Sequence, residues 1–202
     1  LVPETQSCDA ILQAWYPGED GGRAIADVLY GDYNPSGKLP ITFYKNLKQL
    51  PDFKDYSMKG RTYRYMTEDP LFCFGYGLSY TTFNIGQAKA SKNTLSASNA
   101  NDKITLTIPV ENVGKREGTE VVQVYIRRTE DTEGPRKSLR GYARVNVKAG
   151  ATQNAEIVLD AEAFECFDEK SNSMRTLPGQ YEVFYGNSSA DKDLKCIDVT
   201  IK

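Results

Sequence analysis

The sequence predicts a mainly β protein: an immunoglobulin-like or fibronectin type III-like β-sandwich, preceded by a strand–helix–strand remnant of an α/β layer. From about residue 80 onward, apolar residues alternate with polar ones in about seven short segments separated by turns, which is typical of a sandwich. Before residue 80 the chain is rich in Gly, Pro and aromatic residues, and only one stretch has helical periodicity. The single Trp, Trp15, lies outside the β-rich part. The Cys–Trp–Cys core of antibody domains is therefore missing, which favours the fibronectin-like variant.

The opening part, residues 1–45, is expected to hold two strands and a helix. The apolar run 10–16 ends at a Pro-Gly pair and predicts a buried strand. Residues 23–30 have one apolar helical face, with Asp20 or a following Gly placed to cap the start and Gly31 suited to the end. Residues 38–44 predict a second extended segment. Such a unit cannot close a core alone, so we expect it to be the tail of a larger α/β layer.

Residues 46–79 form an irregular, aromatic-rich connecting segment with no regular periodicity. A solvated linker would not carry so many rings, so we expect this segment to be buried against a partner surface. The predicted division of the chain is therefore 1–45, 46–79 and 80–202. The aromatic residues concerned are Phe53, Tyr56, Tyr63, Tyr65, Phe72, Phe74 and Tyr76.

The β-rich part, residues 80–202, shows its strands through residues that share one face. Turn residues separate these groups, for example at Pro178–Gly179. The first strand is expected over Phe83–Ala90. The others are marked by Ile104, Leu106, Ile108 and Val110; Val122, Val124 and Ile126; Ala143, Val145 and Val147; Ile157 and Leu159; Tyr181, Val183 and Tyr185; and Ile197, Val199 and Ile201.

Composition excludes several classes of function. A formal net charge of −2 offers no basic surface for nucleic acid or anionic lipid, and no apolar run approaches the length of a membrane span. The sequence contains no His, which excludes a Ser-His-Asp triad and a His-ligated zinc site. The four Cys are widely scattered without metal-type spacing, so we expect no metal or cofactor and mostly buried, unpaired thiols. A bridge between Cys166 and Cys196 remains open if their strands are neighbours.

Several motifs resemble family 3 glycoside hydrolases. Residues 10–40 read AILQAWYPGEDGGRAIADVLYGDYNPSGKLP, and residues 70–83 read PLFCFGYGLSYTTF, with Cys73 at a position where the family often has Pro. Residues 113–125, VGKREGTEVVQVY, are similar to the fibronectin-like domain of that family, as are LRGY at 139–142 and LPGQYEV at 177–183. The resemblance extends from about residue 10 to the end of the chain.

This resemblance implies an exo-acting retaining β-glucosidase or β-xylosidase built from a (β/α)8 barrel, an α/β sandwich domain and a fibronectin-like domain. Such enzymes use a nucleophilic Asp and an acid/base Glu, both of which precede the Trp15 motif in the family. We therefore expect both groups upstream of Leu1 and no catalytic residue in this chain. The first residue is not Met, which suggests a processed or truncated part of a longer protein. Family habit implies a periplasmic or secreted location, and the barrel and the rest of the α/β domain as partners.

Four residues are candidates for substrate binding: Arg61, Tyr63, Arg64 and Tyr65. Arg and Tyr suit sugar recognition through stacking and hydrogen bonding. The alternative is that they pin the irregular segment onto the α/β layer. The motif KGRTYRY at 59–65 leans towards β-xylosidase-like members.

Other conspicuous residues have structural interpretations. Adjacent Glu19 and Asp20 on a Gly-rich turn are interpreted as a helix N-terminus rather than a carboxylate pair for catalysis. Trp15, on its predicted strand, is interpreted as core, and the basic cluster Arg136, Lys137 and Arg140 as a solvated loop.

Two classes of function remain. The chain is either scaffold, with part of the substrate cleft, of a β-glycosidase, or a non-catalytic carbohydrate-binding or adhesion module. An exposed row of aromatic residues on one sandwich face would favour the binding module.

Overall fold

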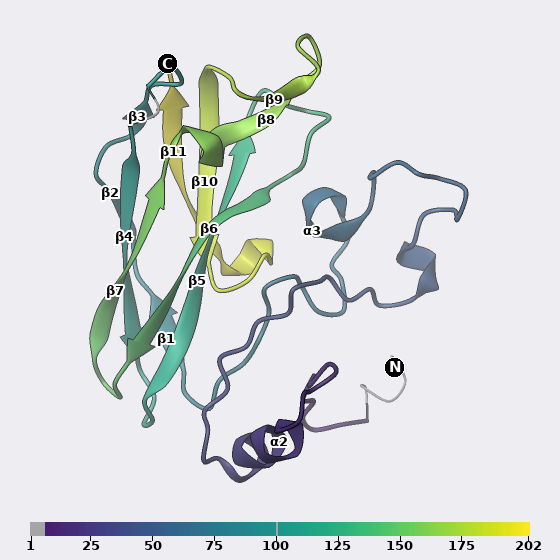
Figure 1. The fold of residues 1–202 in the computed structure, drawn as a ribbon, viewed down its shortest axis with the longest axis vertical. Helices are drawn as coiled ribbons and strands as arrows, with labels where there is room; N and C mark the ends of the chain where they lie inside the picture. The colour runs from purple at the N-terminus through teal and green to yellow at the C-terminus, as the bar shows by residue number, and fades with distance from the viewer. Residues whose placement is uncertain (1–6, 100) are drawn as a thin grey trace.

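The computed structural model describes residues 7–99 and 101–202, and its main body is a sandwich of two sheets (Figure 1). The first sheet is built around β4 (Ile104–Asn112), which pairs antiparallel with β7 (Thr152–Leu159) over residues 104–111. The opposite side of β4 carries two short antiparallel strands, β1 (Phe83–Ile85) and β2 (Lys89–Ala90).

The second sheet has five strands in the order β3-β11-β10-β5-β6. All neighbours are antiparallel except β3 and β11. A register shift interrupts the pairing of β5 with β6 at Val124 and Tyr125. The bounds are Thr94–Leu95 for β3, Gly118–Arg128 for β5, Ser138–Val147 for β6, Gly179–Gly186 for β10 and Leu194–Ile201 for β11.

The core lies between the two sheets and consists of the side chains that the alternating pattern predicted. On β4 every second residue from Ile104 to Val110 is fully buried. Each apolar side chain buried in this way stabilises the fold by roughly 1.5–3 kcal/mol. Facing them across the core are Val122, Val124, Val183, Tyr185, Val199 and Ile201.

A small hairpin extends the sandwich at one end and was not predicted. It consists of β8 (Glu165–Asp168) and β9 (Ser173–Thr176), preceded by the short helix η2 (Ala161–Phe164). Phe167 and Met174 pair across the hairpin and are both about half exposed. Apolar side chains on one face of the hairpin are exposed to solvent. Its sequence therefore lacks a clear alternation of apolar and polar residues.

The predicted strand over Phe83–Ala90 is divided into β1 and β2. Pro109 of β4 has no N–H to donate, so a ladder along this edge is interrupted there. β1 pairs with β4 beyond Pro109, and β2 pairs before it. Gly86 lies at the break, where its N–H donates to the carbonyl oxygen of Pro109 at 2.8 Å.

The predicted helix is present as α2 (Gly21–Tyr30). Gly31 ends it in the left-handed region at φ 83°, and its N–H donates to the carbonyl oxygen of Val28. Asp20 occupies the N-cap position, but its carboxylate accepts hydrogen bonds from Arg23 and caps no backbone N–H. Of the two predicted caps, Asp20 or a following Gly, Asp20 thus holds the N-cap position but makes no side-chain hydrogen bond to the helix backbone.

The two strands predicted beside this helix do not form in the described residues. Residues 10–16 have no strand partner, and Trp15 is 49% exposed, so the interpretation of Trp15 as core is wrong for this chain. Within residues 38–44 the one pairing is an isolated bridge between Phe43 and Phe72. A strand needs a continuous ladder, and the backbone hydrogen bonds between residues 39–43 and 71–76 are too few and too widely spaced to form one.

The fold class is thus confirmed as a mainly β sandwich preceded by an α/β remnant, although only the helix of the remnant has regular structure. Residues 46–79 contain two short helices, η1 (Leu47–Gln49) and α3 (Thr62–Tyr65), and a third, η3 (Asp191–Asp193), precedes β11. The boundaries at residues 45 and 79 stay a prediction. No helix in the described part of the chain is long and apolar enough to cross a membrane.

A buried ion pair joins the opening part to the sandwich. Lys38 Nζ lies 2.8 Å from Glu120 Oε1, with side-chain exposures of 11% and 6%. Lys38 Nζ also donates to the carbonyl oxygen of Gly77, and Glu120 Oε1 accepts from the N–H of Val121. Breaking a buried pair costs more than the pair contributes, because the remaining charge has no partner.

We predict that Lys38→Met lowers the free energy of unfolding by about 3 kcal/mol, since it leaves Glu120 buried and uncompensated. The double variant with Glu120→Gln should recover more than about 1 kcal/mol of that loss, because no unpaired charge remains. Urea denaturation of the three proteins measures both values. A double variant no more stable than Lys38→Met would contradict the pairing.

Candidate functional site

The part of the irregular segment around α3 lies against the outer face of the five-stranded sheet and brings three of the four sequence-predicted site residues to the sandwich, whereas the part before α3 extends away from it (Figure 1). The short helix α3 begins after Arg61, and Thr62 adopts a positive φ of 55°. Two hydroxyl groups hold this turn: the N–H of Thr62 donates to Tyr44 Oη, and the N–H of Tyr63 donates to Thr42 Oγ1.

Tyr63 fastens the segment to the sandwich. Its hydroxyl accepts a hydrogen bond from the N–H of Leu139 on β6 at 3.0 Å. Its ring stacks on Phe74 at 4.4 Å and meets the edge of Tyr125 at 5.6 Å. These contacts correspond to the alternative that the sequence left open, a pinning role, with the sandwich rather than the α/β layer as the surface.

Gln123 forms a second fastening that the sequence did not reveal. Its buried amide nitrogen donates to the carbonyl oxygens of Gly75 and Asn187, at 3.1 and 2.9 Å. Its amide oxygen accepts from the hydroxyl of Tyr125 at 2.6 Å. Gly75, at φ 78°, must lack a side chain, because a Cβ there would lie 2.0 Å from that oxygen. Burial raises the pKa of Tyr125 far above its ordinary value, so its hydroxyl remains a donor.

Arg61 stabilises the loop before α3. Its Nε donates to the carbonyl oxygen of Ser57 at 2.9 Å, and one Nη donates to that of Asp55. The guanidinium is therefore occupied by the segment's own backbone, and Arg61 does not line the cavity described next.

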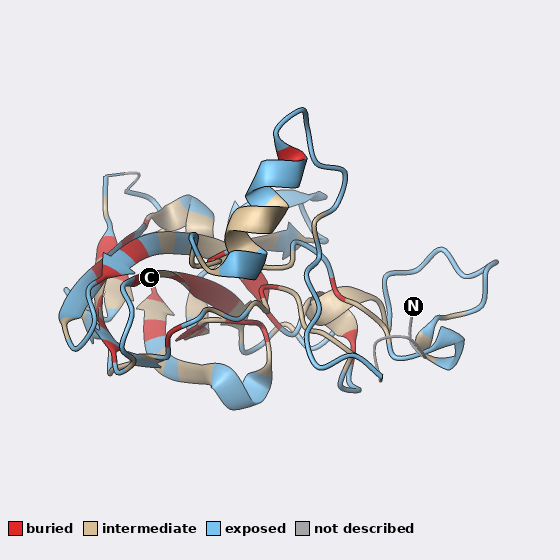
Figure 2. Ribbon diagram, turned by 90° about the horizontal axis from the view of Figure 1, so that it is seen from below, coloured by how far each residue is buried: buried red, intermediate tan, exposed pale blue. Residues whose placement is uncertain are grey.

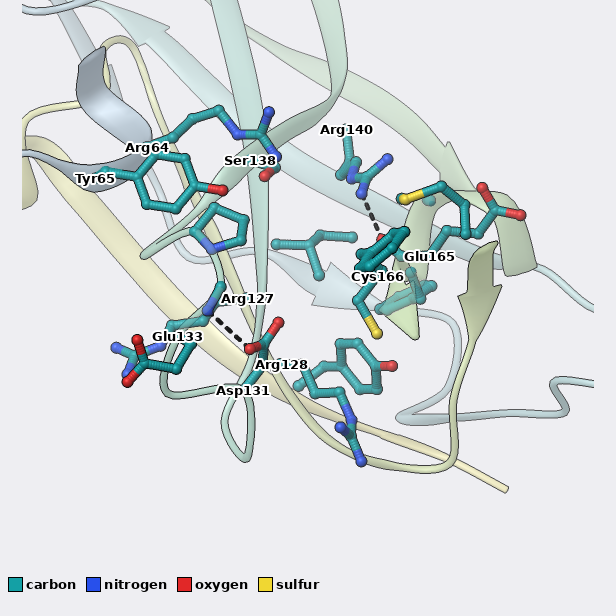
Figure 3. A pocket seen from close by; sticks show the side chains of 18 of the residues that line it. Arg64, Tyr65, Arg127, Arg128, Asp131, Glu133, Ser138, Arg140, Glu165 and Cys166 are labelled. Carbon is teal, nitrogen blue, oxygen red and sulfur yellow. Dashed lines mark hydrogen bonds between the residues drawn. The ribbon is translucent and has the colours of Figure 1, made fainter. Parts of the chain in front are cut away.

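Arg64 and Tyr65 line a cavity of about 250 Å³ between α3, the sandwich and the β8–β9 hairpin (Figure 3). The guanidinium of Arg64 lies over the ring of Tyr65, 5.8 Å from its centre. Ser138 and Arg140 of β6 contribute to the same cavity, as does Arg128 at the end of β5. Figure 3 shows Arg64 and Ser138 next to each other, with Arg140 hydrogen-bonded to Glu165.

The interpretation of Arg136, Lys137 and Arg140 as a solvated loop is wrong for Lys137 and Arg140, whereas Arg136 is exposed. Lys137 is only 6% exposed and pairs with Asp191, and the N–H of Arg136 donates to the carbonyl oxygen of Arg64 at 2.7 Å. Arg140 is half-buried and donates to the carbonyl oxygen of Glu165. These side chains have bonding partners because they face the irregular segment and the hairpin. The alternating strand pattern of the sequence does not predict these neighbours.

Several carboxyl groups of the described residues are held in their charged form by their neighbours. Every described carboxyl group whose pKa is shifted has it lowered, namely Asp55, Asp102, Asp168 and Asp191. Glu19 and Asp20 lie at the exposed start of α2, where Asp20 is paired with Arg23, in agreement with their structural interpretation.

No group of three or more potential ligands gathers at a metal-binding spacing within residues 7–99 and 101–202. The four Cys are free thiols, including Cys166 and Cys196. Contrary to the expectation of mostly buried thiols, Cys8 and Cys196 are exposed and the other two are intermediate. Burial and the charge of Glu182 nevertheless raise the pKa of Cys196 to about 11.

Comparison with known proteins places the two parts of the chain in one family. The Glycosyl hydrolase family 3 C-terminal domain matches residues 1–80, and the Fibronectin type III-like domain matches residues 120–189. The chain is 57% identical over 201 residues to a xylan 1,4-β-xylosidase of Xylanibacter ruminicola, covering 100% of the chain and 23% of that protein. It is 40% identical to a periplasmic β-glucosidase of Salmonella typhimurium, covering 94% of the chain and 26% of that protein.

Solved structures give the same result. A β-glucosidase from Erythrobacter marinus superposes with a TM-score of 0.83 at 36% identity, covering 100% of this chain and 26% of that one. A β-glucosidase from Listeria innocua in complex with gluconolactone superposes with a TM-score of 0.79 at 29% identity, covering 98% and 28%. The chain thus spans about a quarter of the length of these relatives.

We predict that Tyr63→Phe lowers the free energy of unfolding by about 1 kcal/mol, because the N–H of Leu139 loses its acceptor. Tyr63→Ala should cost about 3 kcal/mol, since it also removes the ring stacked on Phe74. Urea denaturation measures both losses, and hydrogen exchange should show faster exchange of the Leu139 amide in each variant. Unchanged exchange at Leu139 in Tyr63→Phe would contradict the pinning role.

A second prediction concerns acid. Burial acts to raise the pKa of Asp191, but the hydrogen bond and charge of Lys137, together with Arg136, outweigh it and lower the pKa below 3.8. A carboxyl group with a lowered folded pKa stabilises the fold above its unfolded pKa, and this contribution is lost as pH falls through the folded value. Asp191→Asn should therefore destabilise the protein by about 1 kcal/mol at pH 7.

The difference between Asp191→Asn and the parent chain should close as pH falls below about 4. Thermal unfolding from pH 7 to pH 3 measures it, with the exposed Asp9→Asn as the control that shows no such trend. A difference that persists unchanged at pH 3 would show that Asp191 acts through packing rather than charge.

Proposed function

The chain belongs to glycoside hydrolase family 3, whose C-terminal domain and fibronectin type III-like domain it comprises, and from this premise we propose that it is the scaffold part of an exo-acting retaining β-glycosidase. The observation that carries the proposal is its 57% identity to a xylan 1,4-β-xylosidase, of which it covers only 23%. The longer protein would hydrolyse β-glucosides or β-xylosides, with the nucleophilic Asp and the acid/base Glu supplied outside this chain.

The polar contacts of the chain support a scaffold role. Gln123 joins the sandwich to Gly75 in the irregular segment, and the buried Lys38–Glu120 pair joins the opening part to β5. Contacts of this kind hold separate segments of a fold together, which is what a scaffold has to do.

Exposed aromatic residues support a packing role towards the rest of the enzyme. Tyr16, Tyr30, Phe53 and Tyr56 are each more than 80% exposed, and Figure 2 shows helix α2 projecting from the sandwich with little cover. A chain rarely leaves so many large rings in water, so we propose that the (β/α)8 barrel and the remaining α/β layer cover them.

Among the four candidate residues, Arg64 and Tyr65 have side chains at a cavity, and Arg61 and Tyr63 hold the segment in place. We retain a role at the edge of the substrate cleft as a prediction for this group. A periplasmic or secreted location is proposed on the name of the Salmonella typhimurium relative, a periplasmic β-glucosidase.

A carbohydrate-binding or adhesion module is the second candidate, and the sandwich gives it little support. Such a module would present a row of aromatic residues on one face. Tyr125, Tyr181 and Tyr185 are instead at most 1% exposed, whereas Tyr142 is exposed. One ring on a strand does not make a sugar-binding platform.

The proposal is tested by hydrolysis of 4-nitrophenyl β-D-xyloside and β-D-glucoside by this chain and by the longer protein that contains it. We expect the longer protein to release 4-nitrophenol and the isolated chain to match buffer. Proton NMR of the first sugar released should show the β-anomer, as retention requires. Turnover by the chain alone, or an inactive longer protein, would overturn the proposal.

A further inference from the structure

The carboxyl end of α2 is bound by two side chains that come from later parts of the chain. The hydroxyl of Tyr80, just before β1, donates to the carbonyl oxygen of Val28 at 2.7 Å. A guanidinium Nη of Arg116, between β4 and β5, donates to the carbonyl oxygen of Gly31 at 3.0 Å. The same guanidinium lies over the ring of Tyr80, 6.0 Å from its centre. The two side chains therefore hold each other as well as the end of the helix.

The charge of Arg116 suits this place. The end of a helix presents carbonyl groups without helical partners and the negative end of the helix dipole, both of which a cation stabilises. α2 has no basic residue in its own last turn. Arg116, which follows Gly31 by 85 residues, supplies that cation from the sandwich.

Asn34 attaches the chain just after α2 to the same place. Its amide nitrogen donates to the carbonyl oxygen of Glu117 at 2.9 Å. Its amide oxygen accepts from Ser79 Oγ at 2.8 Å and from the N–H of Tyr80 at 2.7 Å. A Cβ at Gly118 would lie 2.7 Å from the amide nitrogen of Asn34, so this close approach requires a glycine there.

The backbone that presents Arg116 is fixed from inside the sandwich. Asn112 is fully buried at the end of β4, and its amide nitrogen donates to the carbonyl oxygens of Arg116 and Val147, at 2.7 and 2.9 Å. Its amide oxygen accepts from the hydroxyl of Thr81, the residue after Tyr80, at 2.6 Å. One buried amide thus sets the backbone beside both side chains that bind α2, so the sandwich pre-organises this site.

α2 depends on such contacts because it is too short to be stable alone. It has 10 residues, whereas isolated helices of fewer than about 12–15 residues are marginal in water. Gly21 is its one buried residue, and Leu29 and Tyr30 are 66% and 85% exposed. The chain is attached to the sheet again at Lys38, by its pair with Glu120. Loss of the contacts at the helix end should therefore free α2 and leave the sandwich intact.

We propose that Asn34, Tyr80 and Arg116 form a clamp that fixes α2, and with it the α/β layer to which α2 belongs, in one orientation on the sandwich. The proposal rests on the proposed function, in which the longer enzyme completes that layer. Arg116 is then a positioning residue of the glycosidase: it acts through α2 and keeps the layer aligned with the rest of the enzyme. Catalysis depends on such alignment, because a displacement of about 1 Å can lower a rate roughly 100-fold.

The clamp is tested in this chain by hydrogen exchange followed by NMR. Arg116→Gln should make the amides of residues 24–33 exchange about 10-fold faster and leave those of β4 and β5 unchanged. Arg116→Lys keeps a cation near the helix end and should recover part of the protection. Arg175→Gln, the same change on the exposed β8–β9 hairpin, should not affect α2. Unchanged exchange of α2 in Arg116→Gln would overturn the clamp.

The positioning role is tested in the longer protein with 4-nitrophenyl β-D-xyloside and β-D-glucoside. Arg116→Gln should lower kcat about 10-fold and change KM less than about 2-fold, and Arg116→Lys should restore part of kcat. Arg175→Gln should leave both constants unchanged. An unaltered kcat in Arg116→Gln, despite faster exchange of α2, would overturn the positioning role. Inactivity of the unmutated longer protein would instead overturn the proposed function, and the exchange of α2 would still decide whether the clamp exists.

Discussion

The amide of Gln123 is the interaction on which the arrangement of this chain depends. It reaches out of the five-stranded sheet and bonds the backbone of Gly75 in the irregular segment and of Asn187 after β10. One side chain thus joins three stretches that are distant in sequence. Because it is buried, no water can replace those partners, so the segment can lie on the sheet only in this register. Tyr63, stacked on Phe74, extends the same attachment to β6.

This attachment makes β5 a strand that is buried on both faces. Val122, Val124 and Ile126 point into the sandwich core, while Gln123 and Tyr125 are covered from outside by the irregular segment. Outer faces of antiparallel sheets are commonly solvated. Here the outer cover brings polar groups together under low exposure, as at Gln123 and in the cavity beside Arg64.

The sandwich could be predicted from the sequence because its signal is local: the alternation along residues 104–110 and 181–185 reports the buried face of each strand. Helix α2 was predicted for a similar reason, through its apolar face and Gly31. What failed depended on contacts distant in sequence. Residues 10–16 lack a neighbouring strand. Lys137 is buried by η3 and the irregular segment, and the residues next to Lys137 in the sequence do not reveal this contact. For the four candidate residues, the residue types indicated which contacts they can make but not their partners. The ring of Tyr63, which could stack on a sugar, stacks on Phe74.

The break at Pro109 has a consequence for self-association of the protein at high concentration. A sheet edge with a long row of free N–H and C=O groups is a template on which another chain can add a strand and begin to aggregate. On the side of β4 where Pro109 stands, the edge is made of β1 and β2, of three and two residues, separated by Gly86. Neither piece is long enough to guide a stable intermolecular ladder. The residue that costs the sheet one hydrogen bond therefore also guards it against self-association along this edge.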